Sequence, residues 1–410
     1  MASNVTPHNP TIPAGLTTFT YEVKSAAVSG TTATVVFRIN ADGTPVTLNA
    51  AAAGGSASLT GYTGGPSFLL AYALDQEGVS PVDYNNLGLA NGQPKTVSIA
   101  DLRDTNKALT VGTLSAPDAS GYYTATILSA FPADAKLRSV GLQGYFTQVS
   151  PAGARHAISV VKAVTGDTVR RKVIDSAKCA KCHEWFEGHG GNRVYEVQLC
   201  VQCHVPGMTT SGRGATDAYM NGLDPASATY ATLTSWGVDP TVANAALALP
   251  QLTNNFKDMI HGIHAGKDRT EPFRDARDFR NALTLVDAGK IGFPGILNNC
   301  QSCHTYNGYD GVPAKTLASR QEADNGVFLN GTNRTPADAK AALATINDDD
   351  MMTTPFTASC VSCHDSSAAK AHMTLNGGQV LVKRTTLNSA AESCAVCHGA
   401  SAEFAPSKVH

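Results

Sequence analysis

The sequence predicts two unlike parts: a mainly β N-terminal domain, an antiparallel sandwich or barrel, followed by a loop-rich, part-helical domain. Short runs of alternating apolar and polar residues recur from Leu16 to about Val164 and then stop. All ten cysteines lie between Cys179 and Cys397, so the long N-terminal part has none. A chain of 410 residues is also long enough for two or three domains.

Strands are predicted where apolar residues alternate with polar ones between Gly, Asp, Asn and Pro turns. The segments are TTFTYEVKSAAV, TTATVVFRI, SFLLAYAL, KTVSIA, GYYTATIL, VGLQGYFTQV and HAISVVKAV. Seven strands with this punctuation are typical of an antiparallel sandwich or barrel. Residues 1–15, rich in Pro and Asn, are predicted as an extended arm, and residues 16–166 as the β domain.

Residues 167–410 are predicted to form the second domain, with a few helices among long loops. The helices are expected at Pro240–Leu249, Leu252–Ala265, Asp275–Ala288, Thr335–Ile346 and Ser366–Met373. This segment has too little apolar periodicity for a conventional core. Another apolar component is therefore expected to supply its interior.

A five-residue pattern, Cys-x-x-Cys-His, occurs five times in this domain. Two thiols three positions apart can add to the two vinyl groups of one porphyrin, and the next residue presents an imidazole to the iron. Only 12 of 410 residues are His, so five matches in five pairs have a chance probability on the order of 10⁻⁸. Zinc sites use such cysteine pairs two at a time, and a thioredoxin-like dithiol needs a βαβ frame that is not predicted here.

The motifs therefore predict five covalently attached c-type haems, whose macrocycles would supply the missing apolar interior. The attachment cysteines are Cys179 and Cys182, Cys200 and Cys203, Cys300 and Cys303, Cys360 and Cys363, and Cys394 and Cys397. The proximal iron ligands are His183, His204, His304, His364 and His398.

Bis-His coordination of five irons needs five more histidines, and seven remain. Five of them lie in the haem segment and are the predicted distal ligands: His189, His261, His264, His372 and His410. His261 and His264 are three residues apart, on one face of a predicted helix, so they could serve two neighbouring haems. His156 in a predicted strand and His8 in the arm are the less favoured alternatives.

Two strong axial imidazoles leave no open iron position, which favours electron transfer over bond-making chemistry. The chain is therefore predicted not to be an enzyme, apart from a non-specific terminal reduction of metals. One alternative is a multihaem reductase with one open haem, although no variant motif such as Cys-x-x-Cys-Lys is present. Another is a subunit of a polymeric cytochrome wire, a homo-oligomer or filament in which His8 of the arm reaches a haem of a neighbouring subunit.

Charge and hydropathy argue against nucleic acid as a partner and against a membrane-spanning helix. The formal net charge is −2, with no long basic block, so nucleic acid is not predicted as a partner. No apolar run approaches the roughly 18 residues that a membrane-spanning helix needs. Because covalent haem attachment requires export through the periplasm, the printed sequence is expected to begin at a mature terminus.

The stretches CHEWFEGHGGNR, MIHGIHAG, FPGILNNCQSCH and SCVSCHD, with SCAVCHG running on to KVH, resemble the outer-membrane multihaem cytochromes of metal-reducing bacteria, the OmcA/MtrC type. The resemblance covers nearly the whole chain and implies one β domain plus one pentahaem domain. It maps the family's distal ligands onto the same five histidines. It also implies an extracellular or outer-membrane location, with other cytochromes or a porin-cytochrome complex, metal oxides, flavins or electrodes as partners.

Two departures from this family pattern stand out. The family is typically decahaem, whereas this sequence has five motifs and corresponds to one half of such a molecule. Some members carry a cysteine pair in a β domain, proposed as a redox switch. Here every cysteine belongs to a haem motif, so that switch is missing.

Overall fold

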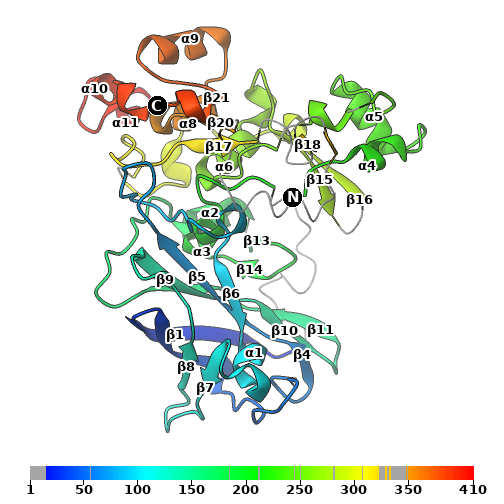
Figure 1. Ribbon diagram of the computed structural model, residues 1–410, viewed down its shortest axis with the longest axis vertical. Coiled ribbons are helices and arrows are strands. Elements are labelled where there is room, and N and C mark those ends of the chain that lie inside the picture. Colours follow the sequence, from blue (N-terminus) through cyan, green and yellow to red (C-terminus); the bar gives the residue numbers. More distant parts are fainter. Residues whose placement is uncertain are drawn as a thin grey trace. The chain divides into compact units, whose positions relative to one another are not determined.

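The structure is a computed structural model (Figure 1). It describes residues 15–55, 57–183, 185–210, 213–243, 245–249, 251–279, 282–306, 308–322, 328–329, 332–333, 348 and 350–410. The predicted arm, apart from its last residue, and the helix expected at Thr335–Ile346 lie outside the described residues. The chain divides into two compact units. The first unit comprises residues 1–86, 94–203 and 301–308, and the second comprises residues 87–93, 204–300 and 309–410.

The first unit is built on antiparallel sheets. One sheet has the order β1-β2-β8-β7, with β3 added to β2: β1 Phe19–Ser29, β2 Thr32–Ala41, β3 Thr44–Pro45, β7 Gly112–Leu114, β8 Tyr123–Ile127. A second has the order β12-β9-β5-β6: β5 Ser67–Ala73, β6 Lys95–Ser98, β9 Lys136–Gln143, β12 Val160–Ala163. A third has the order β11-β10-β4: β4 Tyr62–Gly64, β10 Tyr145–Gln148, β11 Gly153–His156. Every pairing in these sheets is antiparallel.

Aromatic side chains join the sheets into a sandwich. Along β2 every second residue points inward, and Val35 and Phe37 are fully buried, as period-2 alternation requires. Phe37 of the first sheet meets Phe68 of the second edge to face, with ring centroids 5.1 Å apart. Phe19 of β1 packs on Phe146 of β10 at 4.8 Å. The prediction of a mainly β, antiparallel N-terminal domain is confirmed.

Short elements complete the first unit, and two of them, α2 and α3, carry cysteine motifs. They are α1 Ile99–Arg103, η2 Thr105–Lys107, α2 Ser176–His183, β13 Glu187–Gly188, β14 Arg193–Val194 and α3 Val197–Cys203. Helix α3 packs on β9, where Gly141 leaves no room for a Cβ beside Leu199 and Gln202. The Gln202 amide also donates to Ser139 Oγ at 2.8 Å. The sandwich therefore holds the helix with the second cysteine pair directly.

The second unit is loop-rich and part-helical. Its helical elements are η1 Ala90–Gly92, α4 Asp217–Asn221, α5 Ala228–Ser235, η3 Ala245–Ala248, α6 Phe256–His264, η4 Gly266–Asp268, η5 Ala288–Lys290, η6 Cys300–Ser302, α8 Pro355–Val361, α9 Ser367–Leu375, η7 Arg384–Thr386, η8 Ser389–Ala391, α10 Ala395–His398 and α11 Pro406–Val409. Its strands are β15 Arg274–Phe279, β16 Ala282–Asp287, β17 Ser319–Gln321, β18 Phe328–Leu329, β19 Thr332–Asn333, β20 Met351–Thr353 and β21 Val382–Lys383. In the part of the chain that the structure describes, no helix is both long and apolar enough to cross a membrane.

One helix prediction in this unit is wrong. Asp275–Ala288 forms the antiparallel hairpin of β15 and β16, not a helix. The exposure of β16 alternates residue by residue, which is a strand pattern. By contrast, α6 and α9 form within the segments predicted for them, whereas Pro240–Leu249 holds only the 3-10 turn η3.

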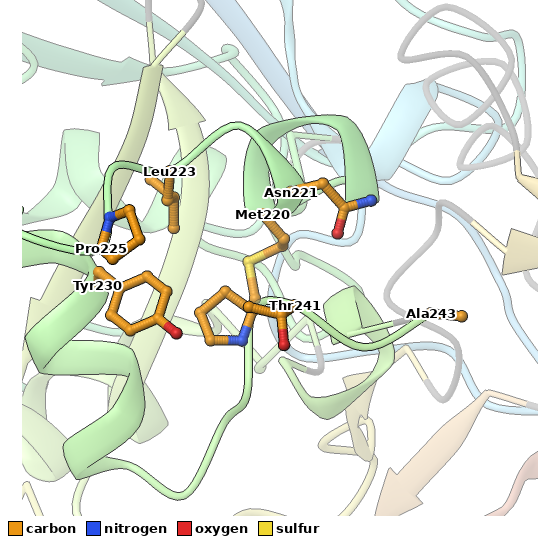
Figure 2. A pocket seen from close by; sticks show the side chains of 8 residues that line it. Met220, Asn221, Leu223, Pro225, Tyr230, Thr241 and Ala243 are labelled. Atoms are coloured by element: carbon orange, nitrogen blue, oxygen red, sulfur yellow. The ribbon is translucent and has the colours of Figure 1, made fainter.

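The hairpin packs on a small conventional core that the sequence analysis did not expect in this domain. Met220, Leu233 and Val238 are buried there, and Ala276 of β15 packs among them. Figure 2 shows a pocket at the surface of this core, between α4, α5 and the loop that follows them. Its lining is Met220, Asn221, Leu223, Pro225, Tyr230, Pro240, Thr241 and Ala243, without a His, Cys or acidic side chain.

Candidate functional site

Each Cys-x-x-Cys-His motif begins on a helical turn. Helix α2 ends at His183, α3 ends at Cys203, η6 begins at Cys300, α8 contains Cys360, and α10 ends at His398. In a helical turn, residues three apart lie on the same face, so the two thiols of each pair point to one side. This is the arrangement that attachment to a single porphyrin requires.

The first and third motifs are neighbours in the first unit. Asp175 N donates to Cys303 O at 3.0 Å, and Lys178 Nζ donates to the carbonyls of Gln301 and His304. A hydrogen bond with the Cys303 thiol, followed by burial, raises the pKa of Cys179. Because a hydrogen bond joins the thiols of Cys179 and Cys303, the first and third attachment sites lie side by side.

The remaining motifs extend this series at both ends. Cys200 of the second motif contributes to raising the Cys179 pKa, so it lies near the first motif. In the second unit, burial, followed by the nearby Cys394 thiol, raises the pKa of Cys360 to about 11. Burial also raises the pKa of Cys363, with a smaller contribution from Cys300. In the first unit, Cys200 and Cys303 therefore both lie near Cys179, and in the second unit Cys394 lies near Cys360 and Cys300 near Cys363.

Two predicted distal histidines face proximal histidines across a gap of suitable width. The ring centroids of His364 and His410 are 5.5 Å apart, and those of His372 and His398 are 6.2 Å apart. Imidazole nitrogens bind metals at about 2 Å, so two imidazoles that hold one metal ion between them would have centroids roughly 6 Å apart. Both centroid distances are close to this value, so each pair of side chains would fit an iron.

Three histidines have one ring nitrogen held by a backbone carbonyl. His204 Nδ1 lies 2.8 Å from Asn254 O, His264 Nδ1 lies 2.8 Å from Ile260 O, and His398 Nδ1 lies 2.9 Å from Phe404 O. A carbonyl oxygen only accepts, so in each case Nδ1 carries the proton and Nε2 keeps its lone pair. Metal-binding histidines are typically oriented in this way.

The other predicted ligands lie on several elements. His261 is on α6, three residues before His264, as predicted. His189 is in the turn of the β13–β14 hairpin with φ +56°, in the left-handed region that few non-glycine residues adopt. Burial lowers the pKa of His304. Burial, followed by the nearby His364, lowers the pKa of His410, which favours the neutral imidazole that a metal needs.

Of the two less favoured candidate ligands, only His156 lies among the described residues. His8 lies outside the described residues. His156 is in β11, with a side chain that is 4% exposed and whose Nδ1 lies 2.7 Å from Glu187 Oε2. The sequence analysis assigned no role to Glu187 or to the carbonyl acceptors of the histidines. Sequence spacing carries no signal for the contacts of His156 with Glu187 and of His204 with Asn254, because these partners are far apart along the chain.

Large apolar side chains are exposed around the motifs. Leu375 is 87% exposed, Tyr306 80%, Val396 78% and Ile296 70%. Soluble proteins rarely expose such residues in groups unless a partner covers them. Ile296, Tyr306 and Val396 lie within four residues of a motif or inside one, where a bound porphyrin would cover them, and the donor sets above fit its iron.

Comparisons with known proteins agree with this chemistry. Residues 171–410 match the family model described as outer membrane cytochrome MtrC/MtrF-like, domains II/IV. No curated protein matches the chain. Two solved structures are similar in fold. The outer membrane decaheme cytochrome OmcA has 16% identity and a TM-score of 0.41, over 94% of this chain and 46% of that chain. MtrC from Shewanella baltica OS185 has 13% identity and a TM-score of 0.42, over 93% of this chain and 51% of that chain.

The present chain thus spans about half the length of these two structures. The family model alone covers more than half of the present chain, including all five motifs. Its description names a haem protein, in agreement with the cysteine and histidine pattern. The chain belongs to the MtrC/MtrF-like outer membrane cytochromes, electron-transfer proteins with covalently bound haem c.

Proposed function

We propose that this chain conducts electrons through five haems, each attached at one Cys-x-x-Cys-His motif and held by two histidines. Bound haem supplies a one-electron couple between ferric and ferrous iron. The observation that carries the proposal is the pair of facing imidazoles, His364 with His410 and His372 with His398. With a histidine on each side, an iron has no position for a substrate, which supports electron transfer over a reductase with one open haem.

The pairing of these ligands is crossed along the chain. His410 follows the fifth motif but faces the histidine of the fourth, and His372 follows the fourth motif but faces the histidine of the fifth. His410 and His372 would thereby link the attachment sites of the fourth and fifth motifs. His183, His204 and His304 remain as proximal ligands for His189, His261 and His264 as distal ones.

The neighbour relations among the cysteines support conduction along a series of sites. Electrons hop between cofactors whose edges lie close together. Within the first unit, the mutual influence of Cys179, Cys200 and Cys303 supports neighbouring sites for the first three motifs. Within the second unit, that of Cys360 with Cys394 and of Cys363 with Cys300 supports neighbouring sites there. An electron could then pass from one haem to the next within each group of neighbouring sites.

The family places the protein at the outer membrane, and we propose that it acts there or in the extracellular space. Other cytochromes or a porin-cytochrome complex would supply electrons, and metal oxides, flavins or electrodes would receive them. The exposed apolar side chain of Phe404, near the C-terminal sites, suits contact with acceptors of little specificity. Assembly as a polymeric wire is the alternative that depends on His8.

The proposal is tested on the mature holoprotein. Mass spectrometry of the unfolded protein should show five covalently attached haems. The oxidised protein should have a wholly low-spin spectrum, and the reduced protein should be reoxidised by flavin or chelated ferric iron. A substantial high-spin population that binds carbon monoxide when reduced would instead support the enzyme alternative. Fewer than five haems would contradict the proposal directly.

A further inference from the structure

We infer that His156 is a positioning residue, through which the β domain holds the loop that carries His189. The inference rests on the proposed function, in which His189 is a distal haem ligand. It gives the β domain a role in the electron-transfer site, beyond that of a spacer. The contacts that support it all lie in the first unit.

The first contact is between side chains. His156 Nδ1 donates to Glu187 Oε2 at 2.7 Å, and the two side chains are 4% and 15% exposed. Glu187 opens the β13–β14 hairpin, two residues before His189. The imidazole of His156 also packs on Tyr145 of β10, with ring centroids 4.5 Å apart. A hydrogen bond to a charged group in such a buried place contributes on the order of 1.5–3 kcal/mol.

The second contact is steric and involves the hairpin turn. His189, Gly190 and Gly191 all have positive φ, at +56°, +68° and +85°. A Cβ on Gly191 would overlap the ring of His156, so the turn lies directly against the imidazole. The backbone of the turn therefore follows the position of this ring. Glycine at this point is required both by its φ and by the close approach.

Backbone hydrogen bonds tie the rest of the hairpin to the sandwich. Ser159 N donates to Val194 O at 3.0 Å, and Val194 N donates to Ser159 Oγ at 3.1 Å. Gly144 N donates to Asn192 O at 2.8 Å. These backbone hydrogen bonds hold the β14 side of the hairpin, and the contact of His156 with Glu187 holds the β13 side. His156 contacts the turn itself, where His189 is placed.

His156 would therefore influence the bond between His189 and a haem iron without itself contacting the iron. A distal imidazole binds well only when its ring is held at the right distance and angle, and partners around the ligand commonly set this. Loss of the His156 anchor should loosen His189 without removing it. One haem of the five would then be partly high-spin, while the other four would be unaffected.

The test compares variants of the full holoprotein. His156→Phe keeps the packing on Tyr145 and removes the hydrogen bond. We expect a partly high-spin, carbon monoxide-binding haem, below one per protein, and a changed midpoint potential for that haem alone. Glu187→Ala breaks the same bond from the hairpin side, without a change in the strands of the sandwich, and should affect the same haem.

Two further variants separate the possible failures. Tyr123→Phe is the matched control, because it also removes buried hydrogen bonds of the β domain, to Leu48 N and Val46 O, far from the hairpin. It should leave all five haems unchanged. His189→Ala should convert one haem completely. If His189→Ala leaves every haem low-spin, the ligand assignment in the proposed function is wrong.

The positioning inference itself fails under three results. The first is that His189→Ala opens a haem while both His156→Phe and Glu187→Ala leave spectra and potentials unchanged. The second is that Tyr123→Phe reproduces their effect, which would show general loosening of the β domain. The third is a complete conversion in His156→Phe with none in His189→Ala, which would make His156 the ligand.

Discussion

Replacement of His410 by Ala should open the haem of the fourth motif, not that of the fifth. His410 faces His364 at 5.5 Å between ring centroids, whereas His398 of the fifth motif faces His372. The expected change is one haem in five, so about 20% of the haem becomes high-spin and binds carbon monoxide when reduced. The potential of that haem should rise, because one strong imidazole ligand is lost.

The stability of the variant should change little. His410 is exposed and directly follows the short helix α11. Replacement of its side chain by a methyl group therefore removes few contacts. Exposed substitutions usually lie within about 0.5 kcal/mol. The main loss is the iron bond itself, which the spectra report.

The identity of the affected haem is read from electron paramagnetic resonance. The imidazole planes of His364 and His410 are 35° apart, and those of His372 and His398 are 85° apart. Nearly perpendicular planes give a low-spin signal of larger anisotropy than planes that are closer to parallel. His410→Ala should remove a signal of the less anisotropic kind, and the matched variant His372→Ala should remove one of the more anisotropic kind. A wholly low-spin spectrum in His410→Ala, or the opposite assignment of the two signals, would refute the crossed pairing.

Three other predictions concern the support of these sites. Asp310→Ala should make the same fourth-motif haem partly high-spin, because Asp310 accepts from Ser407 N and Oγ at 2.8 and 2.7 Å and so anchors the last turn; an unchanged carbon monoxide difference spectrum would contradict this. Asp275→Asn should stabilise the protein at pH 8 and not at pH 4, as measured by urea unfolding. Burial raises the pKa of Asp275 to about 6 from 3.8, so the folded state loses stability as the pH rises between these values, by roughly 3 kcal/mol at most. A gain that is equal at both pH values would show that the carboxylate charge is not the cause. Residues 16–166, expressed alone, should give a β-type circular dichroism spectrum without haem, and a disordered spectrum would place the boundary elsewhere.

The sequence predicted the parts of the site that are local in the chain. Two cysteines and a histidine within five residues form an attachment motif wherever they occur, and the helical turn that carries each motif follows from the same spacing. The alternation along β2, with Val35 and Phe37 facing inward, likewise predicted a strand before any partner was known. The domain boundary near residue 166 stays a prediction.

The hydrophobic pattern gave a wrong prediction in one short segment, because helical and strand periods cannot be told apart over so few residues. The residues of β15 and β16 were predicted as a helix, but they form two antiparallel strands in which Phe279 lies opposite Ala282. Ala276 then enters a small core with Met220 and Leu233, more than forty residues earlier in the chain. Packing of this kind is decided by distant residues, which no window of sequence contains.

What the sequence alone determined about this protein is its cofactor class, covalently bound haem c, from ten cysteines in five motifs that each end on a histidine; the five distal ligands in the haem segment stay a prediction. What only the tertiary structure decided is which imidazole faces which. In the structure His410 lies beside His364 of the fourth motif, His372 lies beside His398 of the fifth, and His156 contacts Glu187 in the hairpin that carries His189. The physical reason is that covalent attachment depends on neighbours within one helical turn. The second axial bond depends on where loops of the folded chain bring side chains that are distant in sequence.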